Sequence, residues 1–203
     1  MTTKEKIMLE AEEQFIKYGI ANTQMKDIAS AVKINRRTLY RYFPTKDELA
    51  FVVEMNVMMQ ISEYLSNGIV DLPDKYSGYE KVVHYFNNVN LDYIKKQIKF
   101  TAEFDRYFVD EYPSEKLESD FVESLDPKND KLYSFIAQGQ EDKSIRTDIT
   151  TIEIYQFLSQ SFISLFQRLL LRENHLKYEF CDEVDFSKLY KDIILQGIKN
   201  IDH

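Results

Sequence analysis

The chain has 203 residues, which is the length of one domain with a small additional module. Its hydrophobic content of 44% and charged content of 30% exclude wholesale disorder. Five glycines and four prolines provide too few turns for an all-β sandwich or a glycine-rich nucleotide-binding fold, and the net charge of −8 at first argues against nucleic acid. The composition therefore favours a globular helical protein.

Apolar residues recur at helical spacing along nearly the whole chain, which predicts an all-α fold. Thr2 with Glu5 forms a capping box that begins the first helix, and Gly19 ends it. Asn35 can cap the third helix, which ends before Pro44. The predicted helices after the first cover about 24–31, 36–43, 45–65, 79–97, 99–110, 114–125, 127–141, 151–173 and 186–201.

The basic residues are concentrated in one short segment. Between Asn22 and Lys46 a single acid, Asp27, accompanies six cations. These cations are Lys26, Lys33, Arg36, Arg37, Arg41 and Lys46. A basic segment on an acidic remainder indicates a DNA-reading module, and chance clustering on a solvated face is the alternative. We therefore divide the chain into a helix-turn-helix DNA-binding domain over 1–47 and a C-terminal domain over 48–203.

The predicted third helix has two different faces at about 100° per residue. Leu39 and Phe43 fall together and would pack on Ile28 and Ala29 of the second helix. The opposite face carries Arg37, Thr38, Tyr40 and Arg41. A small core that presents a basic, aromatic outer face is typical of a DNA-binding helix-turn-helix.

Three cations begin helices, where the helix dipole disfavours positive charge. Arg36 and Arg37 lie in the first turn of the third helix, and Lys46 lies in the first turn of the fourth. Each costs about a few tenths of a kcal/mol. Such a cation is useful where a phosphate docks beside the exposed N–H groups, and a solubilising role is the alternative.

Residues 4–55 resemble the N-terminal domain of TetR/AcrR transcriptional regulators. The resemblance rests on Ile28-Ala29 and on the run Leu39-Tyr40-Arg41-Tyr42-Phe43-Pro44-Thr45-Lys46-Asp47-Glu48-Leu49. Two features depart from the family pattern, because Lys33 stands where the turn usually has glycine and Arg37 where a small residue is usual. Lys33 must then either avoid a positive φ or be strained.

The resemblance implies roles for individual residues. Those facing base edges in the major groove would be Asn35, Arg36, Arg37, Thr38 and Tyr40. Those holding phosphates would be Thr23, Gln24, Lys26, Tyr42 and Lys46, with Arg41 able to do either. The family further implies a cytoplasmic homodimer on a palindromic double-stranded DNA operator, most simply a repressor released by a small-molecule effector.

The helix predicted over 151–173 is apolar on two faces, and both must be buried. One stripe is Ile154, Leu158, Ser161 and Leu165; the other is Ile152, Tyr155, Ser159, Phe162, Phe166 and Leu169. We expect the second stripe to join Leu189 and Ile193 of the last helix in a four-helix dimer interface. The alternative is that both helices are central in a monomer.

Aromatic and acidic residues are dense in the middle of the chain. We expect an effector pocket formed by Tyr93, Phe104, Tyr107 and Phe108. Aromatic rings with nearby carboxylates would suit a cationic apolar ligand. Plain core packing of the rings and a solvated acidic face are the alternatives.

Several function classes lack their residues in this sequence. Cys181 stands alone, so it forms no internal disulfide and fits a reducing compartment. No zinc spacing, phosphate-binding glycine loop or hydrolase motif occurs, so we expect no enzyme, metal or cofactor. The run Leu49–Val53 is too short to cross a membrane, and no membrane partner is expected. The competing hypothesis is a helical interaction module whose basic patch binds an acidic partner.

Overall fold

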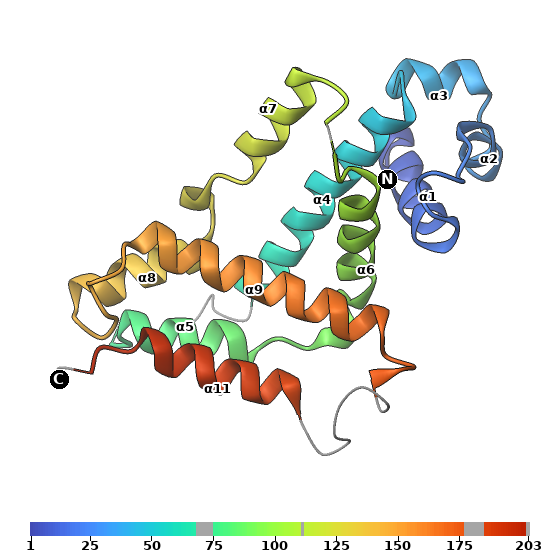
Figure 1. The fold of residues 1–203 in the computed structure, drawn as a ribbon. Coiled ribbons are helices and arrows are strands. Elements are labelled where there is room, and N and C mark those ends of the chain that lie inside the picture. The colour runs from blue at the N-terminus through green and yellow to red at the C-terminus, as the bar shows by residue number, and fades with distance from the viewer. Residues whose placement is uncertain (68–74, 111, 177–184, 202–203) are drawn as a thin grey trace. The chain divides into compact units, whose positions relative to one another are not determined.

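A computed structural model describes residues 1–67, 75–110, 112–176 and 185–201, and these residues are helical without strands, as predicted (Figure 1). They form two compact units. None of the described helices is long and apolar enough to cross a membrane. No group of three His, Cys, Asp or Glu side chains among the described residues is placed to hold a metal ion.

The first unit comprises Met1–Ile61 and Lys95–Leu125. It contains α1 (Thr3–Tyr18), α2 (Met25–Ala31), α3 (Arg36–Tyr42) and α7 (Glu115–Ser124), with parts of α4 (Lys46–Asn67) and α6 (Leu91–Tyr107). The predicted capping box is present, since the Thr2 side chain accepts from the Glu5 N–H. Gly19 ends α1 with a φ of 83°, which glycine adopts without a Cβ clash. The core of this unit includes Phe15, whose ring stacks on Phe100 at 6.1 Å.

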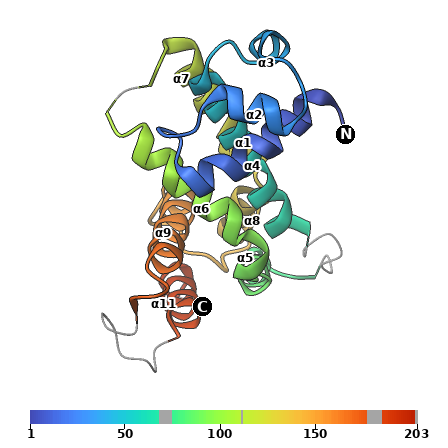
Figure 2. The same ribbon diagram turned by 90° about the vertical axis from the view of Figure 1, so that its right-hand side faces the viewer.

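The second unit comprises Ser62–Ile94 and Asp126–His203. It contains α5 (Gly78–Asn87), a short 3-10 turn η1 (Pro127–Asn129), α8 (Lys131–Glu141), α9 (Thr151–Leu171) and α11 (Phe186–Ile198). Helices α5 and α8 approach closely, because a Cβ on Gly78 would come within 2.0 Å of the Gly139 backbone nitrogen. Figures 1 and 2 show α9 and α11 side by side, where the Tyr190 hydroxyl donates to the Leu158 carbonyl.

Two predicted helix boundaries were wrong. The helix break predicted near residue 98 lies at residues 88–90 instead. There the Asn90 side chain accepts a hydrogen bond from the Asp92 N–H, and α6 begins directly after Asn90. The helix predicted to begin at Pro127 is divided, because Asp126 caps only η1 and Asp130 then caps α8. The functional boundary after residue 47 stays a prediction.

Candidate nucleic-acid interface

The pair α2 and α3 is built on a small buried core. Ile28 and Ala29 of α2 are buried with Leu39 of α3, and Phe43 just after α3 is 2% exposed. The Asn35 side chain accepts from the Thr38 N–H at 2.8 Å and caps α3, as predicted. This core fixes which face of α3 points outward.

The turn between α2 and α3 places Lys33 in the left-handed region, with a φ of 61°. The next N–H, of Ile34, donates to the Ala29 carbonyl at 2.9 Å, which closes the end of α2 in the manner of a Schellman motif. Lys33 therefore occupies the conformation that glycine takes without strain.

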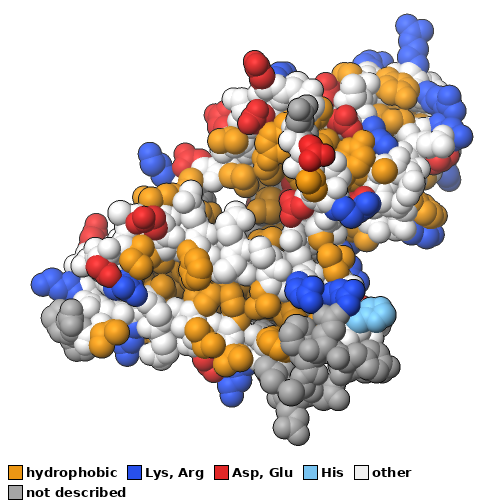
Figure 3. Space-filling view, viewed as in Figure 1, with side chains coloured by type: hydrophobic (Ala, Val, Ile, Leu, Met, Phe, Trp, Pro, Cys, Tyr) orange, Lys and Arg blue, Asp and Glu red, His pale blue; other side chains and the backbone are white. Residues whose placement is uncertain are grey.

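The outward face of α3 is basic and aromatic. Its exposed side chains are Arg36, Arg37, Tyr40, Arg41 and, at the last residue, Tyr42. No acidic residue occupies the first turn of α3, so the two leading arginines are uncompensated there. Figure 3 shows Lys and Arg side chains gathered at the α3 end of the first unit. The geometry suits a polyanion, and Thr38 is half-buried at the edge of this face.

Of the three phosphate contacts predicted at the start of α2, two are exposed and one is not. Gln24 and Lys26 at the start of α2 are exposed. Thr23 is only 4% exposed, and its hydroxyl donates to the Gly19 carbonyl at 2.8 Å. The Thr23 hydroxyl thus satisfies a carbonyl of the loop after α1, and its predicted contact with phosphate stays a prediction.

Lys46 also serves the protein itself rather than presenting a free cation. Its Nζ donates to the carbonyls of Ile20 at 2.6 Å, Ala21 at 3.0 Å and Thr23 at 3.3 Å. Partial burial lowers the pKa of Lys46, although Asp47 opposes this. In this structure the ammonium joins the first turn of α4 to the loop after α1, and its predicted contact with phosphate stays a prediction.

Helix α6 holds the same loop from another side. A carboxylate oxygen of Glu103 accepts from the Ile20 N–H at 2.6 Å and pairs with Arg106. The Tyr107 hydroxyl donates to Asp47 at 3.3 Å, and the Lys46 ammonium stands 5.6 Å from the Tyr107 ring centre. Sequence reasoning missed this junction, and the only signal in the sequence was the unfavourable position of Lys46 at a helix start.

The residues predicted to line an effector pocket are divided between the units. Phe104, Tyr107 and Phe108 lie together in the first unit, where the Phe104 and Phe108 rings are 4.8 Å apart. Tyr93 belongs to the second unit, is 72% exposed and stacks on Tyr64. Tyr93 lies near the opposite end of α6 from the other three residues, because α6 begins at residue 91, and its part in a pocket stays a prediction.

The residues predicted for the dimer interface also lie in different environments. Phe162 and Phe166 are buried in the second unit, 4.5 Å apart and close to Tyr190. Tyr155, Ser159 and Leu169 are half-buried, while Ile152, Leu189 and Ile193 are exposed. Phe162 and Phe166 belong to the core rather than to an outer face, because α5 and α11 both supply rings against α9.

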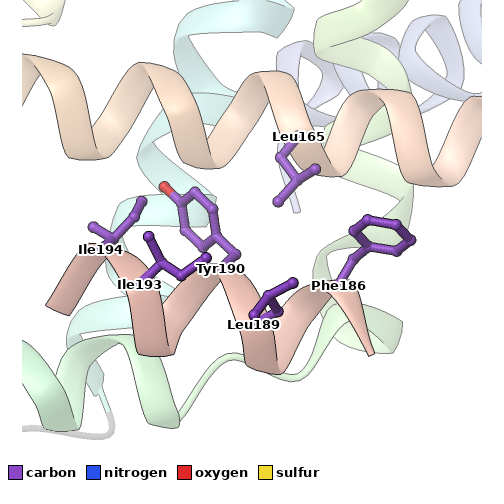
Figure 4. A pocket seen from close by; sticks show the side chains of 6 residues that line it. All are labelled: Leu165, Phe186, Leu189, Tyr190, Ile193 and Ile194. Atoms are coloured by element: carbon purple, nitrogen blue, oxygen red, sulfur yellow. The ribbon is translucent and has the colours of Figure 1, made fainter. Parts of the chain in front are cut away.

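The exposed apolar surface of this unit follows α9 and α11. Phe157 on α9 is 63% exposed, and Ile193 on α11 is 62% exposed. Figure 4 shows a groove between the two helices, into which Leu165 points from α9 and Tyr190 from α11. Figure 3 shows hydrophobic side chains over these helices.

Residues 7–53 match the sequence model described as bacterial regulatory proteins, tetR family. This segment contains the capped, basic α3 and the core beneath it. Residues 7–53 are therefore a helix-turn-helix segment of the TetR type. The HTH-type transcriptional regulator LuxR of Vibrio harveyi is 35% identical over 66 residues, which cover 32% of this chain and 32% of LuxR. The matched segment thus spans about a third of the length of that curated relative.

The TetR-family likeness in fold extends over nearly the full chain. A putative tetR family regulator from Shewanella sp. PV-4 matches with a TM-score of 0.71 and 12% identity, covering 98% of this chain and 99% of that one. The fatty acid degradation regulator FadR of Bacillus halodurans matches with a TM-score of 0.70 and 15% identity, covering 97% and 94%. Thermus thermophilus FadR, solved with lauroyl-CoA, matches with a TM-score of 0.61 and 15% identity, covering 95% and 93%. At these identities the likeness is one of fold.

Proposed function

We propose that this chain is a ligand-responsive transcriptional repressor of the TetR family that binds a palindromic operator as a homodimer and catalyses no reaction. The observation that carries the proposal is the outward face of α3, which bears exposed arginines and tyrosines. The buried side chain of Leu39 fixes the orientation of this face. Arginine reads guanine through two parallel hydrogen bonds, and tyrosine and lysine contact phosphates.

The proposed division of labour follows exposure. Arg36, Arg37 and Tyr40, with the polar side chains of Asn35 and Thr38, read base edges. Gln24, Lys26 and Tyr42 hold phosphates, and Arg41 serves either role. Thr23 and Lys46 support the loop behind them instead.

The proposed dimer uses the outer faces of α9 and α11. Phe157, Leu189 and Ile193 are exposed there, and a Cβ added to Gly197 would meet nothing within 4 Å. Exposed apolar side chains clustered on two neighbouring helices favour burial against a partner. A two-fold dimer would present its two α3 helices about 34 Å apart, one turn of DNA.

The test is binding of the full-length protein to DNA from upstream of its own gene, with a shuffled duplex as competitor. We expect preference for the upstream DNA. Arg37→Ala should cost about 1–3 kcal/mol on that DNA and relax specificity at one base position in each half-site. Lys128→Ala, which removes an exposed cation from η1, is the control and should change neither quantity. Equal affinity for both duplexes would instead favour a basic patch that binds acidic partners without reading sequence.

A further inference from the structure

A cavity of about 450 Å³ lies between the C-terminal end of α6 and the start of α7. Its walls are formed by Phe108, Val109, Asp110, Tyr112 and Glu118. Two of these side chains are aromatic and two are acidic, and no Lys or Arg stands among the described residues that line it. Its volume is within the range of small-molecule sites.

The aromatic wall is held from behind by Phe51 of α4, which is fully buried. The Phe51 ring centre lies 4.8 Å from that of Phe108 and 5.4 Å from that of Tyr112, both in edge-on arrangements. Phe121 of α7 closes the cluster at 5.7 Å from Phe51. A ring packed on one side keeps its orientation, so the Phe108 and Tyr112 rings are held in place at the edge of the cavity.

The electrostatics of the cavity select the charge of its occupant. Asp110 and Glu118 are exposed, while Glu115 and Lys116 in the first turn of α7 carry opposite charges and do not line the cavity. Carboxylates attract a cation directly, and the electron-rich faces of aromatic rings attract it through their quadrupole. An anion of the same shape would be repelled by the same groups.

We propose that this cavity binds a small organic cation with an apolar body, such as an aromatic amine or a quaternary ammonium compound. Phe108 and Tyr112 contact the body and the positive centre, and Asp110 and Glu118 balance the charge. The regulatory meaning of this site rests on the proposed function, whereas the binding itself does not.

The cavity adjoins the contacts through which α6 holds the loop after α1 and the start of α4. Phe108 follows Tyr107, and their rings are 4.7 Å apart. Tyr107 in turn donates to Asp47, and Glu103 one turn earlier accepts from Ile20. A ligand that displaces Phe108 therefore acts on the end of α6 that contacts the loop after α1. It shifts the protein between a DNA-binding and a DNA-released conformation by as much as its affinities for the two conformations differ.

The test uses three probes of nearly one shape: N-methylquinolinium, 1-methylnaphthalene and 1-naphthoate. Their binding to the full-length protein is measured by NMR titration at low and high salt. We expect the cation to bind most tightly and the anion least tightly. The affinity for the cation should fall as the salt concentration rises. Equal affinities for all three, or no binding of the cation at millimolar concentration, would overturn the proposal.

Variants locate the binding. Asp110→Asn and Glu118→Gln should each lower the affinity for the cation by about two- to fivefold and leave the affinity for the neutral probe unchanged. Tyr112→Leu should weaken the cation by a similar factor. Glu123→Gln makes the same change on α7 at an exposed position outside the cavity, and it should have no effect. An equal response of Glu118→Gln and Glu123→Gln would show bulk charge attraction and refute the site.

Operator binding is measured separately, so the two proposals fail independently. If the cation binds but the upstream DNA is not preferred, the site stands and the repressor function falls. If both bind, operator DNA must lower the affinity for the cation by the same factor by which the cation lowers the affinity for operator DNA. Independent binding would refute the coupling through Tyr107. Tighter binding of lauroyl-CoA than of the cation at this cavity would overturn the assigned ligand class.

Discussion

At the scale of single residues, Lys33 shows strain at the turn of the DNA-binding motif. Its φ of 61° carries a steric cost for any residue with a Cβ. Lys33→Gly should therefore raise the free energy of unfolding by about 0.5–1 kcal/mol, the strain relieved exceeding the extra backbone entropy lost. Urea unfolding followed by circular dichroism measures this. Lys33→Ala keeps the Cβ and should give no gain; a gain of the same size would mean that the charge is responsible.

Lys46 tests whether a cation near a DNA-binding face is structural. Lys46→Met removes the donor to three backbone carbonyls and should lower the free energy of unfolding by about 1–3 kcal/mol. Lys26→Met, at an exposed position on α2, should leave stability unchanged and reduce the salt slope of DNA binding by about one unit. Thermodynamic unfolding and salt titrations of both variants decide the matter. The opposite pattern would restore Lys46 as a phosphate contact.

At the scale of elements, α4 carries a buried carboxyl group in the core of the first unit. Glu54 is 3% exposed, and its Oε2 has no hydrogen-bond partner. Burial, with repulsion from Asp105, holds the pKa of Glu54 well above its ordinary value of 4.5. The folded state thus favours the protonated form, so stability is greatest below the ordinary pKa and falls as pH rises through the raised one.

Glu54→Met should accordingly stabilise the protein at neutral pH by about 1–3 kcal/mol and give little gain near pH 4. Urea unfolding between pH 4 and pH 8 is the measurement. Glu63→Met, an exposed position on the same helix, should show no such pH-dependent gain. A constant gain for Glu54→Met at every pH would attribute the effect to packing alone.

At the scale of the whole molecule, the outer faces of α9 and α11 should hold two chains together. Ile193→Glu places a charge in the proposed interface and should give monomers or insoluble protein, because a buried unpaired charge is costly. Sedimentation velocity at micromolar concentration reports the oligomeric state. Ile201→Glu makes the same change at a residue that is 88% exposed and lies beyond α11, and it should remain dimeric. A folded wild-type monomer would contradict the interface.

The sequence by itself determined the features that depend on neighbours a few residues apart. The Thr2–Glu5 capping box, the Asn35 cap and the inward face of α3 at Leu39 all follow from helical spacing. The same spacing identified the exposed arginines of α3. Caps and helix faces depend on residues within one or two helix turns, so the order of residue types along the chain is enough to predict them.

Only the tertiary structure decided the features that join distant segments. Lys46 meets a carbonyl 26 residues away, and Glu103 meets an N–H 83 residues away, so neither role could be read from local spacing. Phe162 was predicted to face a partner chain, because periodicity shows that a helix face is apolar without showing what covers it. Packing against α5 and α11 placed Phe162 in the core and left Phe157 and Ile193 outside.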